Sequence, residues 1–314
     1  MQKVRYKHLN SYLKDKFGER TLKVCVDAGF TCPNRDGTVS CGGCIFCGEM
    51  GAGENIKYRK QEILDSIKSQ VTGFLNSYRG ERANKFIVYF QSFTNTYAPN
   101  DELKLKYDTA LSCSNKIVGI EVATRPDCIN REVAQLLATY KDKYYVCVEL
   151  GFQTASDEVG KVINRGYTTE DFERAVKLLH VYNIDVVAHV MIGLPNETSV
   201  DIKNTINCIN DLKCEGIKLH STYVLTGTKL EELYKNGEYE SITQDYYVNR
   251  VVEIISNLND DVVIHRINAD PPKSMLVAPE WTTHKKIVLN SIERRICELD
   301  INQGDNKLTF GQLG

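Results

Sequence analysis

Apolar residues along the first 225 positions fall into two alternating patterns. Short runs rich in β-branched and aromatic residues have the length and composition of β-strands. The longer segments between them place apolar residues at helical spacing. The short runs predict six strands, at residues 22–28, 86–91, 117–122, 145–152, 185–192 and 216–224.

The segments between these runs predict helices. Two of them begin with helix-start residues: Asn130 precedes one, and the hydroxyl and acidic residues at 168–171 open another. The predicted helices cover residues 59–78, 101–113, 131–140, 168–182 and 200–212. Strands that alternate with helices form right-handed units around a parallel sheet.

Six such units fit an α/β fold, either a partial (β/α)6 TIM barrel or an open doubly wound sheet. Nucleotide-binding signatures are missing, because Gly51 and Gly53 are followed by Ile56 rather than a third glycine, and the chain has no P-loop. The barrel is therefore favoured. We expect a basic N-terminal extension at 1–20, the barrel at 21–225, and a C-terminal extension at 226–314 that covers one end of it. That extension is expected to be mostly helical, with a basic helix at 283–297.

Composition and charge narrow the class of protein. The chain has 314 residues, 42% hydrophobic and 25% charged, which is typical of a globular protein with a sizeable core. A net charge of −2 excludes a strongly basic nucleic-acid coat but not a local basic patch. No apolar run approaches the roughly 18 residues of a membrane span, and the N-terminus has no apolar signal-peptide core. A cytoplasmic location without a membrane partner is expected.

Cysteine is the unusual residue in this composition. The chain has 11 cysteines, an odd number, and no export signal, so metal binding or catalysis is a better interpretation than a disulfide framework. Cys32, Cys41, Cys44 and Cys47 lie within one short segment. Most of the others lie in apolar or helical surroundings and are typical of small core residues.

The cysteine-rich segment, residues 32–47, directly follows the first predicted strand, where barrel enzymes carry their chemistry. Three thiolates from one flexible loop suit an iron–sulfur cluster with one iron left without a protein ligand, and that iron could bind a small-molecule cofactor. Structural zinc and an unligated loop are the alternatives. The usual zinc pattern needs a second Cys-x-x-Cys pair, which this chain lacks.

Six stretches of the chain carry a resemblance to a known family. They are residues 27–38 (DAGFTCPNRDGT), 42–47 (GGCIFC), 89–97 (YFQSFTNTY), 124–127 (TRPD), 149–154 (ELGFQT) and 189–195 (HVMIGLP). Together they resemble the radical S-adenosylmethionine (radical SAM) superfamily, in the branch of the Elongator catalytic subunit and oxygen-independent coproporphyrinogen oxidase. Over nearly its whole length the chain is also similar to a bacterial radical SAM family implicated in modifying the wobble uridine of tRNA. The resemblance implies a partial barrel of the radical SAM type.

The resemblance also implies the cluster ligands. The close family has the pattern C-x11-C-x2-C, which Cys32, Cys44 and Cys47 match, whereas Cys41 is extra and could replace Cys32. The commonest superfamily pattern, C-x3-C-x2-C, is absent. In the superfamily a [4Fe–4S] cluster cleaves S-adenosylmethionine to a 5′-deoxyadenosyl radical, which abstracts hydrogen from an unactivated carbon. A single cluster and an electron donor such as flavodoxin or ferredoxin are expected.

The same resemblance implies which side chains meet S-adenosylmethionine. Gln153 would meet the ribose, and Arg165 would bind a carboxylate. Phe46, which lies between Cys44 and Cys47 in the sequence, would by that position lie beside the cluster and restrict water. Glu121 would meet the cofactor, or else form a barrel-interior salt bridge with Arg125 or Arg165. The other cofactor-binding candidates are Ser92 and Thr94 after the second strand, His189 at the ribose or the substrate, and Ile192 and Leu194 at the adenine.

Charge and the resemblance together suggest the substrate. The first 25 residues hold seven basic and two acidic side chains interleaved with aromatic ones, which suits an RNA backbone, although such runs are also typical of a solvated face. The resemblance to the Elongator subunit implies a wobble-position uridine of tRNA. The candidates for the substrate mouth are Glu149, His220, His265, Arg266 and Trp281.

Two other functions remain open from the sequence. The chain could apply the same radical chemistry to a small metabolite or to a protein. It could instead be a non-catalytic RNA-binding module stabilised by about one zinc ion. In that case Gln153, Arg165 and Glu121 would be ordinary structural residues.

Overall fold

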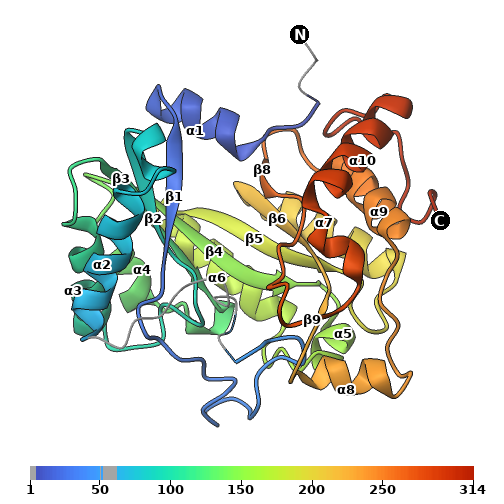
Figure 1. The fold of residues 1–314 in the computed structure, drawn as a ribbon, viewed down its shortest axis with the longest axis horizontal. Coiled ribbons are helices and arrows are strands. Elements are labelled where there is room, and N and C mark those ends of the chain that lie inside the picture. Colours follow the sequence, from blue (N-terminus) through green and yellow to red (C-terminus); the bar gives the residue numbers. More distant parts are fainter. Residues whose placement is uncertain (1–4, 50, 52–61) are drawn as a thin grey trace.

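Seven parallel strands form one curled sheet in the computed structural model, which describes residues 5–49, 51 and 62–314 (Figure 1). The strands are β1 Thr21–Val26, β2 Lys85–Phe90, β3 Ile117–Thr124, β4 Tyr145–Gln153, β5 Asp185–Ile192, β6 Gly216–Ser221 and β8 Val263–Arg266. They lie side by side in this order, and every neighbouring pair is parallel. Because β1 and β8 are the two ends of the sheet, the barrel is incomplete and has an open seam between them.

Helices that connect the strands pack against the outer face of the sheet. They are α2 Ile63–Leu75, α3 Asn100–Leu111, α4 Arg131–Ala138, α6 Thr169–Val181 and α7 Ser199–Asp211, with the short α5 Asp157–Val162 and 3₁₀ turns at Gly80–Arg82 and Pro126–Cys128. The Asn130 side chain caps α4, and Thr168 and Thr198 form capping boxes on α6 and α7. These caps explain why the helices begin where the sequence predicts.

The predicted partial barrel is confirmed, and all six predicted strands are present. The predicted helix at 59–78 begins at Ile63 within the described residues, and its residues 59–61 lie outside them. A seventh strand, β8, comes from the segment expected to form a helical extension. It has only four residues, of which His265 and Arg266 are polar, so its apolar part is shorter than the runs that mark the other strands.

The chain after β6 adds elements to one end of the sheet. They are α8 Lys229–Lys235, α9 Gln244–Asn257, α10 Lys285–Glu298, a 3₁₀ turn at Glu280–Thr283, and an antiparallel pair of β7 Val224–Leu225 with β9 Leu276–Ala278. Helices α9 and α10 pack together and share the main core. The helix expected at 283–297 corresponds to α10.

The N-terminal segment contains a helix that the sequence analysis did not identify, α1 Leu9–Phe17. His8 caps it with its side chain and forms an isolated parallel bridge to Ile264 of β8. Leu9 and Leu13 are buried against Val263. Helix α1 therefore lies across the amino end of the seam, opposite the cysteine-rich loop (Figure 1).

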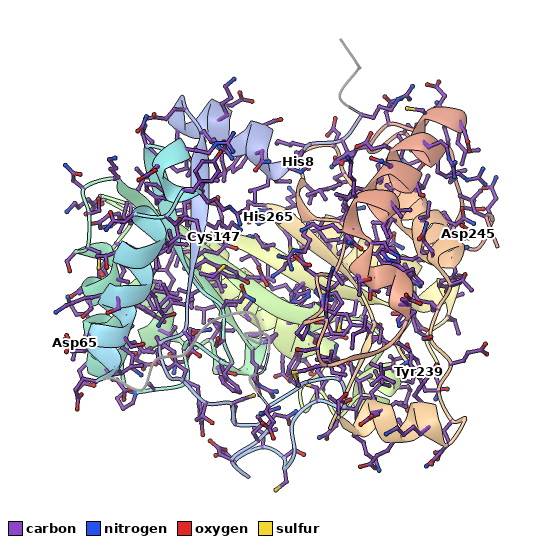
Figure 2. The ribbon with its side chains drawn as sticks, viewed as in Figure 1. His8, Asp65, Cys147, Tyr239, Asp245 and His265 are labelled. Atoms are coloured by element: carbon purple, nitrogen blue, oxygen red, sulfur yellow. The ribbon has the colours of Figure 1, made fainter. Side chains whose placement is uncertain are left out.

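Alternation along the strands gives the sheet an apolar outer face and a polar inner face. Outward residues such as Val24, Val88 and Ile120 are fully buried in the main core. Cys147 and His265 lie within the barrel in Figure 2. No helix among the described residues is long and apolar enough to cross a membrane.

Candidate functional site

The cysteine-rich loop follows β1 and lies at the carboxyl ends of the strands (Figure 1). Backbone hydrogen bonds from Arg35 N to the Cys32 carbonyl (2.8 Å) and from Gly43 N to the Asn34 carbonyl (2.8 Å) shape it. Gly43 has φ of 80°, a left-handed conformation that glycine adopts without strain. The loop thus turns back on itself and brings its second half over the barrel.

Two of the expected ligand thiols lie in direct contact. A hydrogen bond from Cys47 lowers the pKa of Cys44 and raises that of Cys47. The Asn34 amide donates to Cys44 Sγ at 3.6 Å. Cys32 is close enough for its charge to raise the pKa of Cys47, whereas Cys41 is exposed. Among the described residues no group of three or more His, Cys, Asp or Glu side chains is arranged so that it could hold a metal ion.

A turn after α5 holds the loop in place. Ile45 N donates to the Ile163 carbonyl at 3.1 Å, and the Asn164 amide donates to the Gly43 carbonyl at 2.7 Å. In return the Asn34 amide donates to the Asn164 carbonyl at 2.7 Å. The position of Cys44 is therefore set by the turn from the other side of the barrel.

Arg165 anchors this turn and is completely buried. Its Nη1 donates to the carbonyls of Phe152 (2.7 Å) and Thr154 (2.5 Å). Its Nε donates to the Tyr167 carbonyl at 3.0 Å, and its Nη2 pairs with Asp157 at 2.9 Å. All three guanidinium nitrogens thus have protein partners, which favours a positioning role over the predicted carboxylate contact.

Gln153 is connected to Arg165 through Tyr167. It ends β4 with φ of 58°, and its side-chain oxygen accepts a hydrogen bond from the Tyr167 hydroxyl at 2.6 Å. The Gly151 carbonyl lies 2.7 Å from the same hydroxyl and is the alternative acceptor for its single hydrogen. The predicted pair of Gln153 and Arg165 is therefore joined by the strand end and Tyr167.

The barrel interior contains two buried ion pairs. Lys23 of β1 donates to Glu121 at 2.6 Å, so the partner of Glu121 is neither Arg125 nor Arg165. Lys218 of β6 donates to Glu149 at 2.7 Å. Burial alone would raise the pKa of Glu149, but the charge of Lys218 holds it below its usual value.

Two histidines stand beside the Glu149 pair. His189 Nδ1 is 3.6 Å from Glu149, and its Nε2 is buried without a hydrogen-bond partner among the described residues. The His189 and His220 rings meet edge-on at 5.3 Å. Burial and the nearby Lys218 lower the pKa of His189 to about 3, and burial lowers that of His220 as well. Both rings are neutral at neutral pH and can accept a hydrogen bond.

A cavity of about 360 Å³ lies between the histidines and the cysteine-rich loop. Of the predicted residues, Phe46, Cys47, His189, His220 and Arg266 line it. Glu149, His265 and Arg266 line an adjoining cavity. The structure therefore brings these residues into one interior space.

The other predicted cofactor residues lie outside the walls of both cavities. Ser92 and Thr94 are buried in the turn after β2. Ile192 belongs to the main core, and Leu194 packs with Ile45 under the loop. Their expected contacts with the cofactor remain predictions, as does the placement of Trp281, whose indole donates to the Ile242 carbonyl at 3.0 Å.

Several residues of the site were missed in the sequence. Lys23 and Cys25 alternate with the buried Val24 and Val26, and Lys218 lies between Ile217 and Leu219. This alternation is a signal that could have found them, because a polar side chain on every second residue of a barrel strand points inward.

We predict that His189 makes the protein sensitive to acid. The unfolded chain binds a proton at this residue below about pH 6.5, whereas the folded chain resists it down to about 3. Folding stability should therefore fall as the pH decreases from about 6.5, by about 1.4 kcal/mol per pH unit relative to a His189→Gln variant that cannot titrate. Urea unfolding of both proteins between about pH 7 and pH 5 measures this difference. Equal slopes for the two proteins would contradict it.

Comparison with known proteins identifies relatives of this chain. Residues 32–209 match the family model of the radical SAM superfamily, and residues 214–298 match the radical SAM C-terminal domain. Uncharacterized protein YtqA of Bacillus subtilis is 35% identical over 292 residues, 93% of this chain and 89% of that protein. Uncharacterized protein MJ0486 of Methanocaldococcus jannaschii is 34% identical over 295 residues, again 93% and 89%.

The fold is also similar to a solved structure. Elp3 from the archaeon Methanocaldococcus infernus, with N-terminal residues 1–46 deleted, superimposes with a TM-score of 0.64. The match covers 88% of this chain and 63% of that one at 19% identity, so it shows the likeness of the folds. The match of residues 32–209 to the radical SAM family model favours an enzyme over the zinc-stabilised binding module.

The loop residues fit an iron–sulfur cluster. They offer three thiols from one loop, and the Asn34 amide donates to one of the sulfurs, a contact of the kind that tunes such clusters. The cavity beside Phe46 and Cys47 leaves space for a small molecule next to them. Donor chemistry and space therefore agree with the family's cofactors.

Proposed function

This chain belongs to the radical SAM superfamily, whose members use a [4Fe–4S] cluster and S-adenosylmethionine, and we propose that it is the enzyme that modifies a wobble-position uridine of tRNA. The observation that carries the radical chemistry is the cysteine-rich loop directly above an interior cavity. When bound, the two cofactors supply a 5′-deoxyadenosyl radical that abstracts hydrogen from an unactivated carbon.

Three cysteines would hold the cluster in this proposal: Cys32, Cys44 and Cys47. The turn at Asn164 fixes Cys44 through the backbone of the loop. Phe46, between two of the ligands, presents its ring to the cavity and would keep water away from the reacting atoms. Cys41, exposed at the loop surface, would not be a ligand.

The barrel wall would orient the bound molecules without changing its own charge. Glu149 stays ionised through its contact with Lys218 and can accept hydrogen bonds from hydroxyl groups. His189 and His220 stay neutral near it. Fixed dipoles and charges of this kind orient a substrate without reorganising during the reaction.

Two observations support tRNA as the substrate. The first is similarity to the Elongator subunit: the fold is similar to that of Elp3, and the sequence is similar to that of Elongator complex protein 3. Helix α1 carries Lys14 and Lys16 in its last turn, and Leu9 and Leu13 of the same helix line the cavity at the open seam. Both lysines are exposed, and exposed basic side chains suit contacts with RNA phosphates.

Nucleoside analysis of tRNA tests this proposal. A strain that lacks the gene should lose one modified uridine and accumulate its precursor, measured by mass spectrometry of digested tRNA. The wild-type gene should restore the modified nucleoside, and a Cys44→Ala gene should not. If every tRNA nucleoside is unchanged on deletion, the tRNA substrate is wrong and a small metabolite or protein substrate takes its place.

A further inference from the structure

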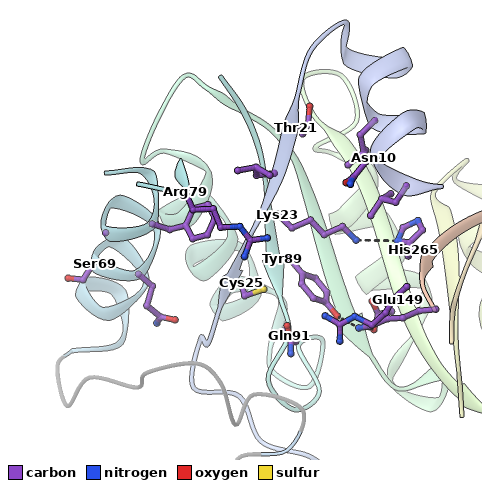
Figure 3. Close-up of a pocket in the computed structure, with 18 residues that line it drawn as sticks. Asn10, Thr21, Lys23, Cys25, Ser69, Arg79, Tyr89, Gln91, Glu149 and His265 are labelled. Atoms are coloured by element: carbon purple, nitrogen blue, oxygen red, sulfur yellow. Dashed lines mark hydrogen bonds and ion pairs between the residues drawn. The ribbon is translucent and has the colours of Figure 1, made fainter. Parts of the chain in front are cut away.

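A second cavity opens at the seam between β1 and β8 (Figure 3). We call it the seam cavity; it measures about 650 Å³ and extends from α1 along β1 to Glu149 and Arg266. Figure 3 shows Lys23 reaching across from β1 toward His265, which it meets at 3.2 Å. The residues that this cavity shares with the one below the cysteine-rich loop are Cys25, Arg79, Gln91, Lys218 and Arg266. The two cavities are therefore adjoining parts of one interior space.

Two of the cations in these walls already have carboxylate partners. Lys23 is paired with Glu121 and Lys218 with Glu149, so each buried charge is compensated. The other carboxylate at the wall, Asp270, is exposed at the rim and lies 3.4 Å from Lys285.

Arg79 and Arg266, unlike the two lysines, have no carboxylate partner among the described residues. Neither guanidinium makes a side-chain hydrogen bond, and neither has a carboxylate within 4 Å among the described residues; Arg79 instead lies over the Phe74 ring. Arg266 stands opposite Lys218 in the register of β6 and β8, which places two cations next to each other. Positive charge therefore exceeds negative charge on the walls where the two cavities meet.

We propose that the seam cavity binds an oxyanion of the substrate, a phosphate or a carboxylate, held by Arg266 and Arg79. A guanidinium forks onto either group with two parallel hydrogen bonds. The anion would supply the partner that these two arginines lack. This inference rests on the proposed function, because it assigns the anion to the molecule that the radical attacks.

Cys25 provides a reporter inside the same space. It lies on the inner face of β1 and lines both cavities, and its side chain is accessible to solvent. A small alkylating reagent that enters the seam should reach this thiol. An anion on Arg266 and Arg79 would block the approach, so the alkylation rate of Cys25 reads out occupancy.

The test uses the reconstituted holoenzyme, with the alkylation of each cysteine followed by peptide mass spectrometry. The probes are inorganic phosphate, acetate, uridine 5′-monophosphate and uridine, at equal ionic strength set with chloride. We expect at least one of the three anions to slow Cys25 alkylation several-fold, while Cys297, exposed on α10, reacts at an unchanged rate. Arg266→Gln and Arg79→Gln should each weaken the protection about tenfold. Arg174→Gln, on the exposed side of α6, should leave it intact.

The outcomes separate the sources of the anion. Protection by free phosphate or acetate supports a separate small oxyanion, whereas protection by uridine 5′-monophosphate alone supports the phosphate of a nucleotide. Equal protection by uridine and its monophosphate, or no protection by any anion, would overturn the proposal. If Arg266→Gln does not fold, Arg79→Gln, whose side chain is exposed, still decides the question.

The same preparation distinguishes failure of this inference from failure of the proposed function. Release of 5′-deoxyadenosine by the wild-type holoenzyme reports radical chemistry without any added anion. Radical chemistry without anion protection would overturn only the seam site. Anion protection without radical chemistry would leave the seam site and overturn the proposed reaction.

Discussion

Replacing Cys44 by alanine is expected to abolish both iron binding and the cleavage of S-adenosylmethionine. The wild-type protein, purified without oxygen and reconstituted with iron and sulfide, should hold about four irons per chain, as a [4Fe–4S] cluster requires. Cys44 is the thiol that the structure fixes most firmly, because it contacts Cys47 and accepts a hydrogen bond from Asn34. Its loss leaves two ligands for the cluster. Iron content should fall below about one per chain, and 5′-deoxyadenosine release should fall at least ~100-fold.

Cys41 provides the matched control in the same loop. It is exposed, and its backbone pairs with that of Asp36 at the loop surface. Cys41→Ala should therefore retain iron and cleavage activity, whereas Cys32→Ala should lose both. The opposite result, iron lost with Cys41→Ala and kept with Cys32→Ala, would assign the third ligand to Cys41. One zinc and no iron in the wild-type protein would contradict the cluster itself.

The strands that could be predicted from the sequence are those whose outward side chains are buried under helices. Burial on that face requires apolar residues, and these residues form a recognisable run. Strands β2 and β4 are such cases, since their alternate residues enter the main core under the helices. Strand β8 could not be recognised in this way. Its pairing partner β6 lies more than forty residues earlier in the chain, and β-structure of this length depends on such partners more than on its own residues.

The residues of the candidate site also differ in how far the sequence could predict them, and the difference again depends on the distance between partners along the chain. The cysteine-rich loop is local in sequence, so its chemistry could be predicted from spacing. The interior pairs are not local: Lys23 and Glu121 are 98 positions apart, and Lys218 and Glu149 are 69 apart. Alternation along each strand marks these lysines as inward-pointing, but it does not show which carboxylate of another strand each lysine meets. The correct partner of Glu121 therefore required the register of the whole barrel.

Arg165 shows a second limit of sequence reasoning. Its motif drew attention to a residue that matters, but the sequence could not show that it is fully buried. A guanidinium without solvent must satisfy its donors within the protein, and here the acceptors are backbone carbonyls at the end of β4 and beyond it. The same turn holds Asn164 against the loop that carries Cys44. Arg165 is thus expected to act on the cluster site through the backbone.

Replacing Arg165 by methionine should lower the free energy of unfolding by about 3–5 kcal/mol. The change leaves the buried carbonyl of Thr154 without a donor, at about 1–3 kcal/mol. It also removes the charged-donor bonds to the Tyr167 carbonyl and to the Phe152 carbonyl, which keeps only its bond from Thr154 N. The ion pair with Asp157 adds little, because that carboxylate is 45% exposed. Arg165→Lys should recover only part of the loss, since an ammonium cannot fork onto several acceptors.

Urea unfolding of the two variants, beside Arg174→Met on the exposed side of α6, measures this effect. The control should change stability by less than about 0.5 kcal/mol. A positioning role also predicts that iron retention falls together with stability, because the turn that holds the loop is loosened. A cofactor contact predicts a different split: stability and iron content would be unchanged, and the affinity for S-adenosylmethionine alone would fall. That second pattern would restore Arg165 as a carboxylate ligand.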